Sequence, residues 1–554
     1  MLQGKILRDA IISASNCLAK EKQAVDELNI FPVPDGDTGT NMSMTMAAAS
    51  RELARLEQPS ISQAADVASS ALLRGARGNS GVILSLLFRG FSKGLKGKEE
   101  ANGADLAEAL SLGVESAYKA VMKPTEGTIL TVAREAAAKG SETAASDPSV
   151  SPVWKAICAE AEASLERTPD LLPVLKKAGV VDAGGKGLCI IFRAMQDVFE
   201  GGAIVESSDT TQEHSSTAGV NAAGAFEVDI KFTYCTEFIV GREKGNTRDP
   251  LRLRAYLESM GDSVVVVDDS EIIKVHVHTN DPGLVLSEGL KYGQFETVKI
   301  ENMKIQHANT AWVPESQEQP MPPQRREPEN EYGFVAVAAG EGLHALFSDL
   351  GCDTVVSGGQ TMNPSTDDIL GAIQATPAKV VFVLPNNKNI ILSAEQAVPL
   401  ADRKVHVLQT RTIPQGISAM LSFNPEDNVE DNLLNMMKSA DNVSTGSITF
   451  AARNSDFGGH SIKKGEILAL ENGKVIFTHS DIRHSTIKLT KSIVNTRKIT
   501  GKDTSFITLI YGEDVDQAQA EEVRDAIQSK VGNAVDITLV NGGQPVYYYF
   551  ISVE

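Results

Sequence analysis

A change in hydrophobic periodicity is the feature that most constrains the fold of this chain. Throughout residues 1–200, apolar side chains recur at helical spacing, beginning with Ile6, Leu7, Ala10 and Ile11. The same spacing continues in the segments 42–56, 61–74, 80–95, 104–121, 128–139, 152–166 and 186–199. Almost no strand-like alternation separates these segments, so we predict an all-α region of eight short helices and no strands.

Two polar segments without this periodicity are predicted to be linkers. Residues 201–224 are small and polar, and residues 313–331 are rich in Pro, Glu and Gln. Residues 225–312 show the order β-α-β-β-α-β, which is typical of a ferredoxin-like sandwich. From residue 332 to residue 554, strands and helices alternate as in a doubly wound parallel sheet. We therefore predict a multidomain chain with a helical domain over 1–200 and two α/β domains after it.

Composition excludes several classes of protein. The chain of 554 residues has 52 Lys and Arg against 72 Asp and Glu, a net charge of −20, which disfavours binding to nucleic acid or to an anionic membrane surface. Its five Cys are scattered, which is typical of a reducing compartment rather than of a disulfide framework. The first twenty residues lack the apolar segment of a signal peptide, and no run of 18 apolar residues occurs. We expect a cytoplasmic protein without a transmembrane segment.

The sharpest motif is the stretch NIFPVPDGDTGTN, which begins at Asn29 and precedes a predicted helix. It places two carboxylates, Asp35 and Asp37, on either side of one glycine. Carboxylate oxygens on a turn suit Mg²⁺, which shares its remaining coordination positions with water and phosphate. The alternative is an ordinary Asp-Gly turn that caps the helix.

Three more glycine-rich loops precede predicted helices in the same region. They are centred on Gly78-Asn79-Ser80, on Thr128, and on Asp182-Ala183-Gly184. A helix N-terminus presents free backbone N–H groups and a positive dipole end, which together favour anions. Each loop alone is more often a helix cap, but four such loops at one end of a bundle predict a nucleotide-phosphate site.

Two loops of the C-terminal region occupy the positions at which α/β sheets bind ligands. Residues 357–366 and 384–389 each follow a predicted strand and precede a predicted helix. Ligands of open α/β sheets bind beyond the carboxyl ends of the strands, although ordinary connecting loops are an equal alternative here.

A Cys and two His are predicted to share one face of the middle domain. His276 and His278 alternate along one strand, and Cys235 lies on a strand that neighbours it in a ferredoxin-like sheet. These three side chains suit a Zn²⁺ site, with Glu237 or water as the fourth ligand. A hydrogen-bonded His pair without metal is the alternative.

The motifs PDGDTGTNM, GNSG and DAGGKGL resemble those of the L subunit of dihydroxyacetone kinase, which folds as an eight-helix barrel. By this resemblance Asp35 and Asp37 bind two Mg²⁺ ions that hold ATP, and Asn29 stands nearest to the position of a further Asp in that family. The resemblance also implies a set of residues that contact phosphate, metal or adenine: Thr38, Gly39, Asn41, Gly78, Asn79, Ser80, Thr128, Asp182 and Gly184.

Over its full length the sequence resembles the family of the ATP-binding subunits of fatty acid kinases. The resemblance implies a homodimeric kinase subunit that transfers the γ-phosphate of ATP to the carboxylate of a fatty acid held by a partner protein, giving acyl phosphate for phospholipid synthesis. It implies that Cys235, His276 and His278 bind Zn²⁺, that Asp35, Asp37, His276 and His278 act in catalysis, and that the C-terminal domain docks the partner. A ketose kinase of the dihydroxyacetone type and an ATP-sensing scaffold without turnover are the alternatives.

Overall fold

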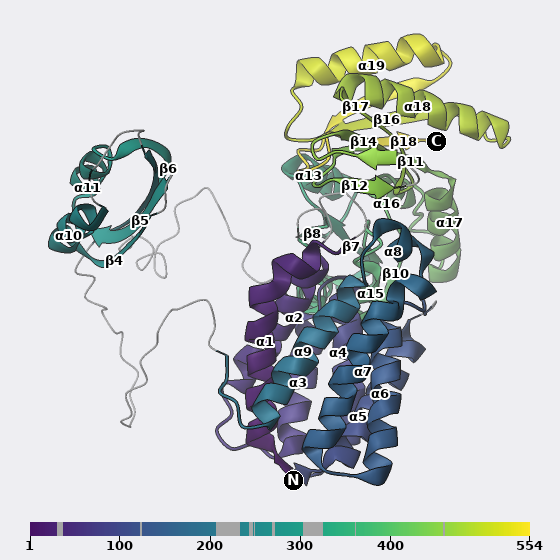
Figure 1. Ribbon diagram of the computed structural model, residues 1–554. Helices are drawn as coiled ribbons and strands as arrows, with labels where there is room; N and C mark the ends of the chain where they lie inside the picture. The colour runs from purple at the N-terminus through teal and green to yellow at the C-terminus, as the bar shows by residue number, and fades with distance from the viewer. Residues whose placement is uncertain are drawn as a thin grey trace. The chain divides into compact units, whose positions relative to one another are not determined.

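The computed structural model describes residues 1–554 except 30–36, 122–123, 206–232, 243–247, 249, 269–271, 303–324, 360–361 and 458–459. Contacts divide the chain into two compact units. One unit comprises Met1–Thr211 together with Pro322–Glu554, and the other comprises Gln212–Met321. Each unit is described below on its own (Figure 1).

The N-terminal region of the first unit is a bundle of helices, which confirms the prediction of a helical N-terminal region. The helices described in it are α1 (Gly4–Asp26), α2 (Thr38–Leu53), α3 (Ile61–Gly75), α4 (Gly78–Gly94), α5 (Gly103–Ala120), α6 (Ile129–Ser146), α7 (Val150–Leu171), α8 (Pro173–Ala178) and α9 (Ala183–Phe199). Nowhere in the described residues is a helix long and apolar enough to cross a membrane. The long helices run side by side along the bundle, with α1 beside α9 and α4 beside α5 (Figure 1).

Local signals in the sequence start several of these helices. Ser60 accepts a hydrogen bond from the backbone of Gln63 at 3.2 Å, and the Gln63 side chain accepts one from the backbone of Ser60 at 2.9 Å. Asn102 and Asp105 form the same reciprocal pair before α5. Such capping boxes satisfy N–H groups that have no partner within the helix.

A buried tryptophan joins α7 to α9 in the bundle core. The Trp154 side chain is 1% exposed, and its indole N–H donates to the carbonyl oxygen of Phe192 at 3.0 Å. Its ring packs edge-on against Phe192 and Phe199, with centroids 5.7 and 5.0 Å apart. Edge-to-face contacts of this kind add to the stabilisation from burial, so Trp154 reports directly on the packing of α9.

The prediction that residues 1–200 contain no strands is wrong at one point. Strands β1 (Leu2–Gln3) and β2 (Glu100–Ala101) form a two-residue antiparallel ladder. A ladder this short shows no detectable alternation in a sequence, because that signal needs about four residues or more.

The first half of the C-terminal region is a parallel sheet covered on both faces, which confirms its α/β character. Its strands are β7 (Asn330–Ala338), β8 (Thr354–Ser357), β9 (Ala378–Leu384) and β10 (Lys404–Val407), in the order β10-β9-β7-β8. The surrounding helices are α13 (Glu341–Asp349), α14 (Thr366–Ala375), α15 (Ile391–Ala397), α16 (Ile413–Leu421) and α17 (Val429–Asn442), with the short 3₁₀ helix η1 (Val398–Leu400). Alternate residues of β9 enter separate cores, Phe382 on one face and Val381 and Val383 on the other. Burial on both faces explains the nearly continuous apolar sequence of this strand.

The second half departs from the predicted doubly wound parallel sheet. Strands β11 (Ser444–Phe450), β14 (Ile467–Glu471), β15 (Lys474–His479), β16 (Phe506–Tyr511), β17 (Asp536–Asn541) and β18 (Tyr549–Val553) form one sheet in the order β15-β14-β11-β18-β16-β17. Within this sheet, only the described strands β16 and β17 pair in parallel. Helices α18 (Ile482–Ile499) and α19 (Gln517–Val531) belong to this half, as does a separate pair, β12 (Ser455–Phe457) with β13 (His460–Ile462).

A two-residue turn explains part of this departure. Asn472 and Gly473 connect β14 to β15 with φ values of 49° and 78°. An Asn-Gly turn with two positive φ angles matches the twist of an antiparallel hairpin. This dipeptide is a local signal for an antiparallel pair, and it lies in a region whose overall alternation predicts a parallel sheet.

The second unit contains β3 (Tyr234–Arg242), α10 (Pro250–Met260), β4 (Gly261–Asp268), β5 (Ile272–Thr279), α11 (Pro282–Gly289) and β6 (Gly293–Asn302). Its strands are all antiparallel and lie in the order β4-β5-β3-β6. Phe238, Val240, Val275 and Val277 are buried in its core, at alternating positions of β3 and β5.

Candidate functional site

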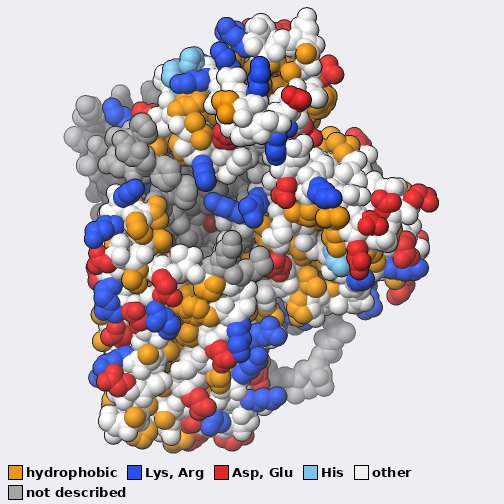
Figure 2. All heavy atoms as spheres, turned by 90° about the vertical axis from the view of Figure 1, so that its right-hand side faces the viewer, with side chains coloured by type: hydrophobic (Ala, Val, Ile, Leu, Met, Phe, Trp, Pro, Cys, Tyr) orange, Lys and Arg blue, Asp and Glu red, His pale blue; other side chains and the backbone are white. Residues whose placement is uncertain are grey.

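A cavity of about 730 Å³ lies in the first unit, lined by both its helical part (residues 1–205) and its C-terminal part (residues 325–554). From the helical part it is lined by residues at or near the starts of α2, α4, α6 and α9. These four starts correspond to the four loops singled out in the sequence, and Figure 2 shows Lys and Arg side chains bordering the hollow on one face of the molecule. Because helix starts attract anions, the cavity suits a phosphate-bearing ligand.

Asp37 lies at the centre of one wall, immediately before α2. One carboxylate oxygen accepts a hydrogen bond from the Asn41 amide at 2.7 Å, and the other accepts one from the Asn363 amide at 2.7 Å. Asn41 is 3% exposed, so the pair is held within the protein rather than by solvent. The structure therefore brings two predicted residues, Asp37 and Asn41, into direct contact, and adds Asn363 from the C-terminal part.

The end of α1 supports the same loop. The Oδ1 atom of Asn29 accepts a hydrogen bond from the Thr38 hydroxyl at 2.8 Å, so these two predicted residues also meet. Asp26, which the sequence analysis missed, accepts hydrogen bonds from the backbone N–H groups of Gly39 and Thr40 and from the Thr40 hydroxyl. Asp26 therefore accepts hydrogen bonds from backbone N–H groups at the start of α2 that have no partner within the helix. It follows a helical run with no turn residues around it, so its spacing carried no signal of this role.

The start of α4 lies against Asn41. Gly78 has a φ of 57°, and a Cβ atom built on it would lie 2.5 Å from the Asn41 amide nitrogen. Only glycine fits both the backbone conformation and this approach. Asn79 is exposed and its amide lies 3.5 Å from Asn389 Oδ1, while Ser80 is half-buried, and both line the cavity.

The opposite wall is formed by the starts of α6 and α9. The Thr128 hydroxyl donates to the carbonyl oxygen of Thr125 at 2.7 Å. Asp182 Oδ2 accepts a hydrogen bond from the backbone of Gly185 at 2.7 Å, and Gly184 follows it in the cavity wall. Burial raises the pKa of the Asp182 carboxyl to about 6, against the opposing effect of hydrogen bonds from the backbone of Gly185 and Ile129. Asp182 is thus a partly solvent-accessible carboxyl whose ionisation costs free energy.

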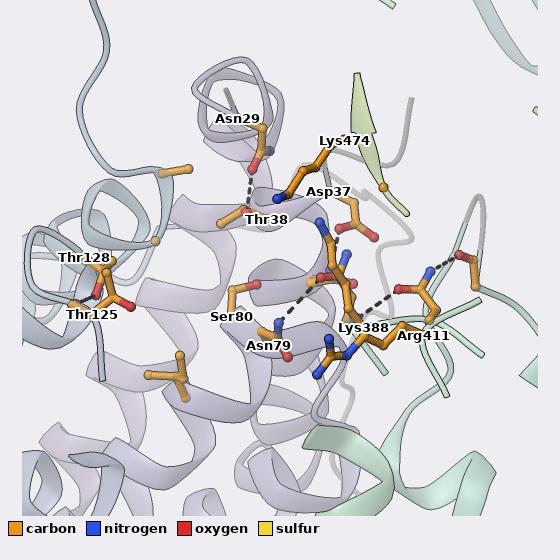
Figure 3. A pocket seen from close by; sticks show the side chains of 18 of the residues that line it. Asn29, Asp37, Thr38, Asn79, Ser80, Thr125, Thr128, Lys388, Arg411 and Lys474 are labelled. Carbon is orange, nitrogen blue, oxygen red and sulfur yellow. Dashed lines mark hydrogen bonds between the residues drawn. The ribbon is translucent and has the colours of Figure 1, made fainter. Parts of the chain in front are cut away.

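The C-terminal part supplies the remaining wall. Gly359 and residues 386–389 follow the carboxyl ends of β8 and β9, as predicted for the loops 357–366 and 384–389. Arg411 follows β10, and Lys474 begins β15; neither was predicted. Figure 3 shows Lys388, Arg411 and Lys474 on the same side of the cavity as Asp37, with Thr125 and Thr128 across from them.

Known protein families match all three regions of the chain, and curated relatives match its whole length. Residues 333–554 match the C-terminal domain, and residues 231–310 the middle domain, of the FakA-like family of fatty acid kinase subunits, and residues 32–197 match the DAK2 domain. Protein YloV of Bacillus subtilis is 41% identical over 562 residues, covering 100% of this chain and 99% of that protein. A protein of Staphylococcus haemolyticus is 39% identical over the same coverage. The chain belongs to the FakA-like family of fatty acid kinase subunits.

Solved structures resemble only parts of this family member, and weakly. A fatty-acid-binding DegV family protein from Thermus thermophilus matches with a TM-score of 0.31 and 15% identity, covering 40% of this chain and 99% of that one. The dihydroxyacetone kinase of C. freundii in complex with AMP-PNP and Mg²⁺ matches with a TM-score of 0.28 and 22% identity, covering 34% of this chain and 33% of that one. Similarities of this size support no statement about the ligands of the present chain.

Several site residues implied by the family resemblance lie outside the described part of the chain. Asp35 falls among the residues that are not described, and so do the side chains of Cys235, His276 and His278. The backbone register of the second unit pairs Cys235 with His278 and Glu237 with His276 across β3 and β5. Among the side chains that are described, no group of three or more His, Cys, Asp and Glu could hold a metal ion. The Zn²⁺ set therefore stays a prediction, as do the catalytic roles of Asp35 and of the two His.

Proposed function

We propose that this chain is the ATP-using subunit of a fatty acid kinase, which transfers the γ-phosphate of ATP to the carboxylate of a fatty acid presented by a partner protein. Family membership supports a kinase, and the cavity supports the position of its nucleotide site. The single observation that carries the proposal is that Asp37 and four helix starts line one cavity of about 730 Å³, a size suited to a small-molecule ligand.

The residues present fit Mg²⁺ at Asp37. The available donors are carboxylate oxygens of Asp37 and side-chain oxygens of Asn29 and Thr38, which are the hard ligands that Mg²⁺ prefers. We propose that Asp35 completes this set from the adjacent loop, with either one or two ions. When bound, Mg²⁺ would neutralise charge on the phosphates of ATP.

The chain's own residues would bind and orient the nucleotide. Residues at the starts of α4 and α9 line the cavity, and free backbone N–H groups of helix starts can donate to phosphate oxygens. A fatty acid carboxylate is ionised near neutral pH, since ordinary carboxyl pKa values lie at about 4. One carboxylate oxygen can therefore attack the γ-phosphorus directly, forming an acyl phosphate while the bond to the β-phosphate oxygen breaks and ADP leaves. No general base is needed for this step, so positioning and charge neutralisation carry the catalysis.

The experiment that tests this proposal follows label from [γ-³²P]ATP in the presence of Mg²⁺, a fatty acid and a fatty-acid-binding partner, with each omitted in turn. Label should enter a hydroxylamine-sensitive product only in the complete mixture. Asp37→Ala should abolish labelling without loss of folded protein, whereas Asp147→Ala, at the far end of α6, should leave it unchanged. Full activity of the Asp37 variant would refute the proposal. Labelling of dihydroxyacetone in a parallel mixture, with none of the fatty acid, would refute it as well. ATP binding without any turnover in the complete mixture would point to a sensing scaffold.

We also propose the domain division 1–200, 225–312 and 332–554 with linkers 201–224 and 313–331, and a homodimeric assembly. The strand order β4-β5-β3-β6 supports the ferredoxin-like interpretation of the middle domain, and the long helices of residues 1–200 support an eight-helix barrel. The register of Cys235 opposite His278 supports a Zn²⁺ site there. Metal analysis of the full chain and of Cys235→Ser tests this site, since a true site loses its Zn²⁺ in the variant.

A further inference from the structure

The charges that line the cavity are divided between the two parts of the unit. Among the described lining residues, both carboxylates, Asp37 and Asp182, come from the helical part. All three cations of that described lining, Lys388, Arg411 and Lys474, come from the C-terminal part. ATP carries several negative charges on its phosphates. On the helical side, the described lining offers neutral hydrogen-bond donors and helix N-termini to these charges, but no Lys or Arg. The positive side chains that such a ligand requires therefore come from the C-terminal part of the unit.

The loop that carries Lys388 is held in place by buried amides. Asn386 is 5% exposed and adopts a φ of 55°, and its amide donates to the carbonyl oxygen of Val337 at 3.1 Å. The backbone N–H of Asn386 donates to the Thr410 hydroxyl at 3.2 Å, which links this loop to the one that ends in Arg411. Both cations therefore project from connected loops beyond the carboxyl ends of parallel strands, the edge at which α/β sheets bind ligands.

Lys474 is positioned by the β14–β15 hairpin. The backbone N–H of Asn472 donates to the carbonyl oxygen of Thr445 at 2.8 Å, and the Asn472 side chain accepts from the backbone of Thr445 at 3.0 Å. These two bonds fix the turn against β11. In Figure 3 the Lys474 side chain extends toward Thr38 and Asp37.

Contacts beside the cavity hold the two parts together. On one side, the Arg77 guanidinium donates to the carbonyl oxygen of Asn363 at 2.7 Å and lies 3.4 Å from Asp368, while the Asn363 amide donates to Asp37. The backbone N–H of Thr366 also donates to the carbonyl oxygen of Ala76 at 3.1 Å.

At the end of α1, the Arg453 guanidinium donates to the carbonyl oxygens of Asp26 and Glu27. These contacts lie beside the cavity and hold the C-terminal part, which carries the cationic loops, against the helical part.

We propose that the C-terminal part completes the nucleotide site, with Lys388, Arg411 and Lys474 binding the γ-phosphate of ATP and stabilising it during transfer. This inference rests on the proposed kinase function and assigns to the C-terminal part a role beyond the docking of a partner. Cations placed where charge develops on a transferring phosphoryl group are effective because they are already oriented. The helical part then supplies the metal-binding carboxylates, and the C-terminal part supplies the fixed positive charge.

The test uses the full chain with its partner and compares Lys388→Gln, Arg411→Gln and Lys474→Gln. Each substitution removes a charge from an accessible side chain without creating a cavity in a core. The matched control is Lys404→Gln. Lys404 is exposed and lies at the amino end of β10, whereas Arg411 follows the carboxyl end of the same strand. Turnover of ATP and binding of Mg-ADP and of a Mg-bound non-hydrolysable ATP analogue are measured for each variant.

Removal of a γ-phosphate contact should affect the triphosphate and spare the diphosphate. We expect each of the three variants to lower kcat/KM for ATP by about a hundredfold to a thousandfold, as for loss of one preorganised donor. The affinity for the triphosphate analogue should fall by about tenfold, while that for ADP changes by less than about threefold. Arg411→Lys, which keeps the charge, should recover part of the lost turnover.

Two outcomes would overturn the assignment. One is that all three variants match Lys404→Gln in turnover and in binding. The other is that ADP and the triphosphate analogue weaken equally, because the cations would then not distinguish the γ-phosphate. If the wild-type chain forms no acyl phosphate, the proposed function fails, but the contrast between ADP and the triphosphate analogue still decides whether these cations contact the γ-phosphate.

Discussion

Asp182 offers a direct test of the electrostatics of the cavity, because its charge is unfavourable in the folded protein. Burial raises its pKa to about 6, whereas an Asp in an unfolded chain titrates near 3.9. Between these two values the folded state keeps a proton that the unfolded state has released. The free energy of unfolding therefore falls as the pH rises through this window. The loss is about 0.5 kcal/mol at pH 4 and approaches about 3 kcal/mol at pH 7, from two pKa units at 1.36 kcal/mol each.

Asp182→Asn removes this loss while keeping the helix start. An Asn side chain can accept the same hydrogen bond from the backbone of Gly185, and Asn caps helices about as well as Asp. We therefore expect the variant to be more stable than the parent at pH 7 by about 2 to 3 kcal/mol, and to lie within about 0.5 kcal/mol of it at pH 4. The matched control is Asp105→Asn. Burial raises the pKa of Asp105, but hydrogen bonds from the backbone of Asn102 and from Lys98 outweigh it and leave the pKa lowered, so this variant should lose stability at pH 7.

The assay is urea denaturation followed by the fluorescence of Trp154, which packs on α9, the helix that Asp182 caps. Trp312, the other tryptophan of the sequence, is replaced by Phe in all proteins so that the signal reports the helical part alone. An Asp182→Asn protein that is no more stable than its parent at pH 7 would refute the reasoning. A stability gain of the same size at pH 4 and pH 7 would also refute it, because it would then not arise from ionisation.

Three further predictions follow from contacts in the same unit. Gly78→Ala should lower the free energy of unfolding by about 1–2 kcal/mol because of the positive φ alone. It should also lower ATP turnover, because the new Cβ displaces Asn41. Thermal unfolding and turnover assays check this, and no effect on either would contradict it. Asn363→Asp places a second carboxylate against Asp37 in place of a donor, so acyl phosphate formation should need more Mg²⁺, measured as a higher half-saturating concentration; an unchanged Mg²⁺ dependence would contradict this. Ser60→Ala should destabilise the helical part by about 1 kcal/mol in urea without changing turnover, since it breaks only the capping box of α3.

Local signals predict several residues of the helical half of the candidate site, although not Asp26. Asp37, Asn41, Ser80 and Asp182 all belong to, or directly follow, turn sequences that precede a periodic apolar run. Their convergence on one cavity follows from helices that run along one bundle and begin at the same end. The predicted roles of Asp35, His276 and His278 are not tested by the described residues.

The C-terminal half of the site depends on contacts between distant residues. Asn363 and Asp37 are 326 residues apart, and no periodicity or turn pattern in a sequence connects positions so distant. Lys388 lies in a loop that was predicted to bind ligand, but its orientation toward the helical part comes from the packing of the two parts. The Asn472-Gly473 turn, by contrast, is visible in the sequence, and recognition of it as a hairpin would have predicted both the antiparallel strands and the exposed position of Lys474.

The contact between Arg77 and Asn363 has a consequence for the synthesis of the protein. The two residues are separated by 286 positions, so Arg77 leaves the ribosome long before its partner exists. At about 5–20 residues per second, this interval lasts roughly 15–60 s. During that time the helical part must fold with this edge uncovered. That edge carries an arginine, glycines and hydroxyl or amide side chains, together with apolar cavity-lining side chains such as Ile83 and Leu175. The nascent domain therefore exposes a mixed surface until the C-terminal part is made. The cavity is therefore among the last features of the first unit to be assembled, and a chain truncated before residue 363 would carry a folded helical part whose cavity is left open.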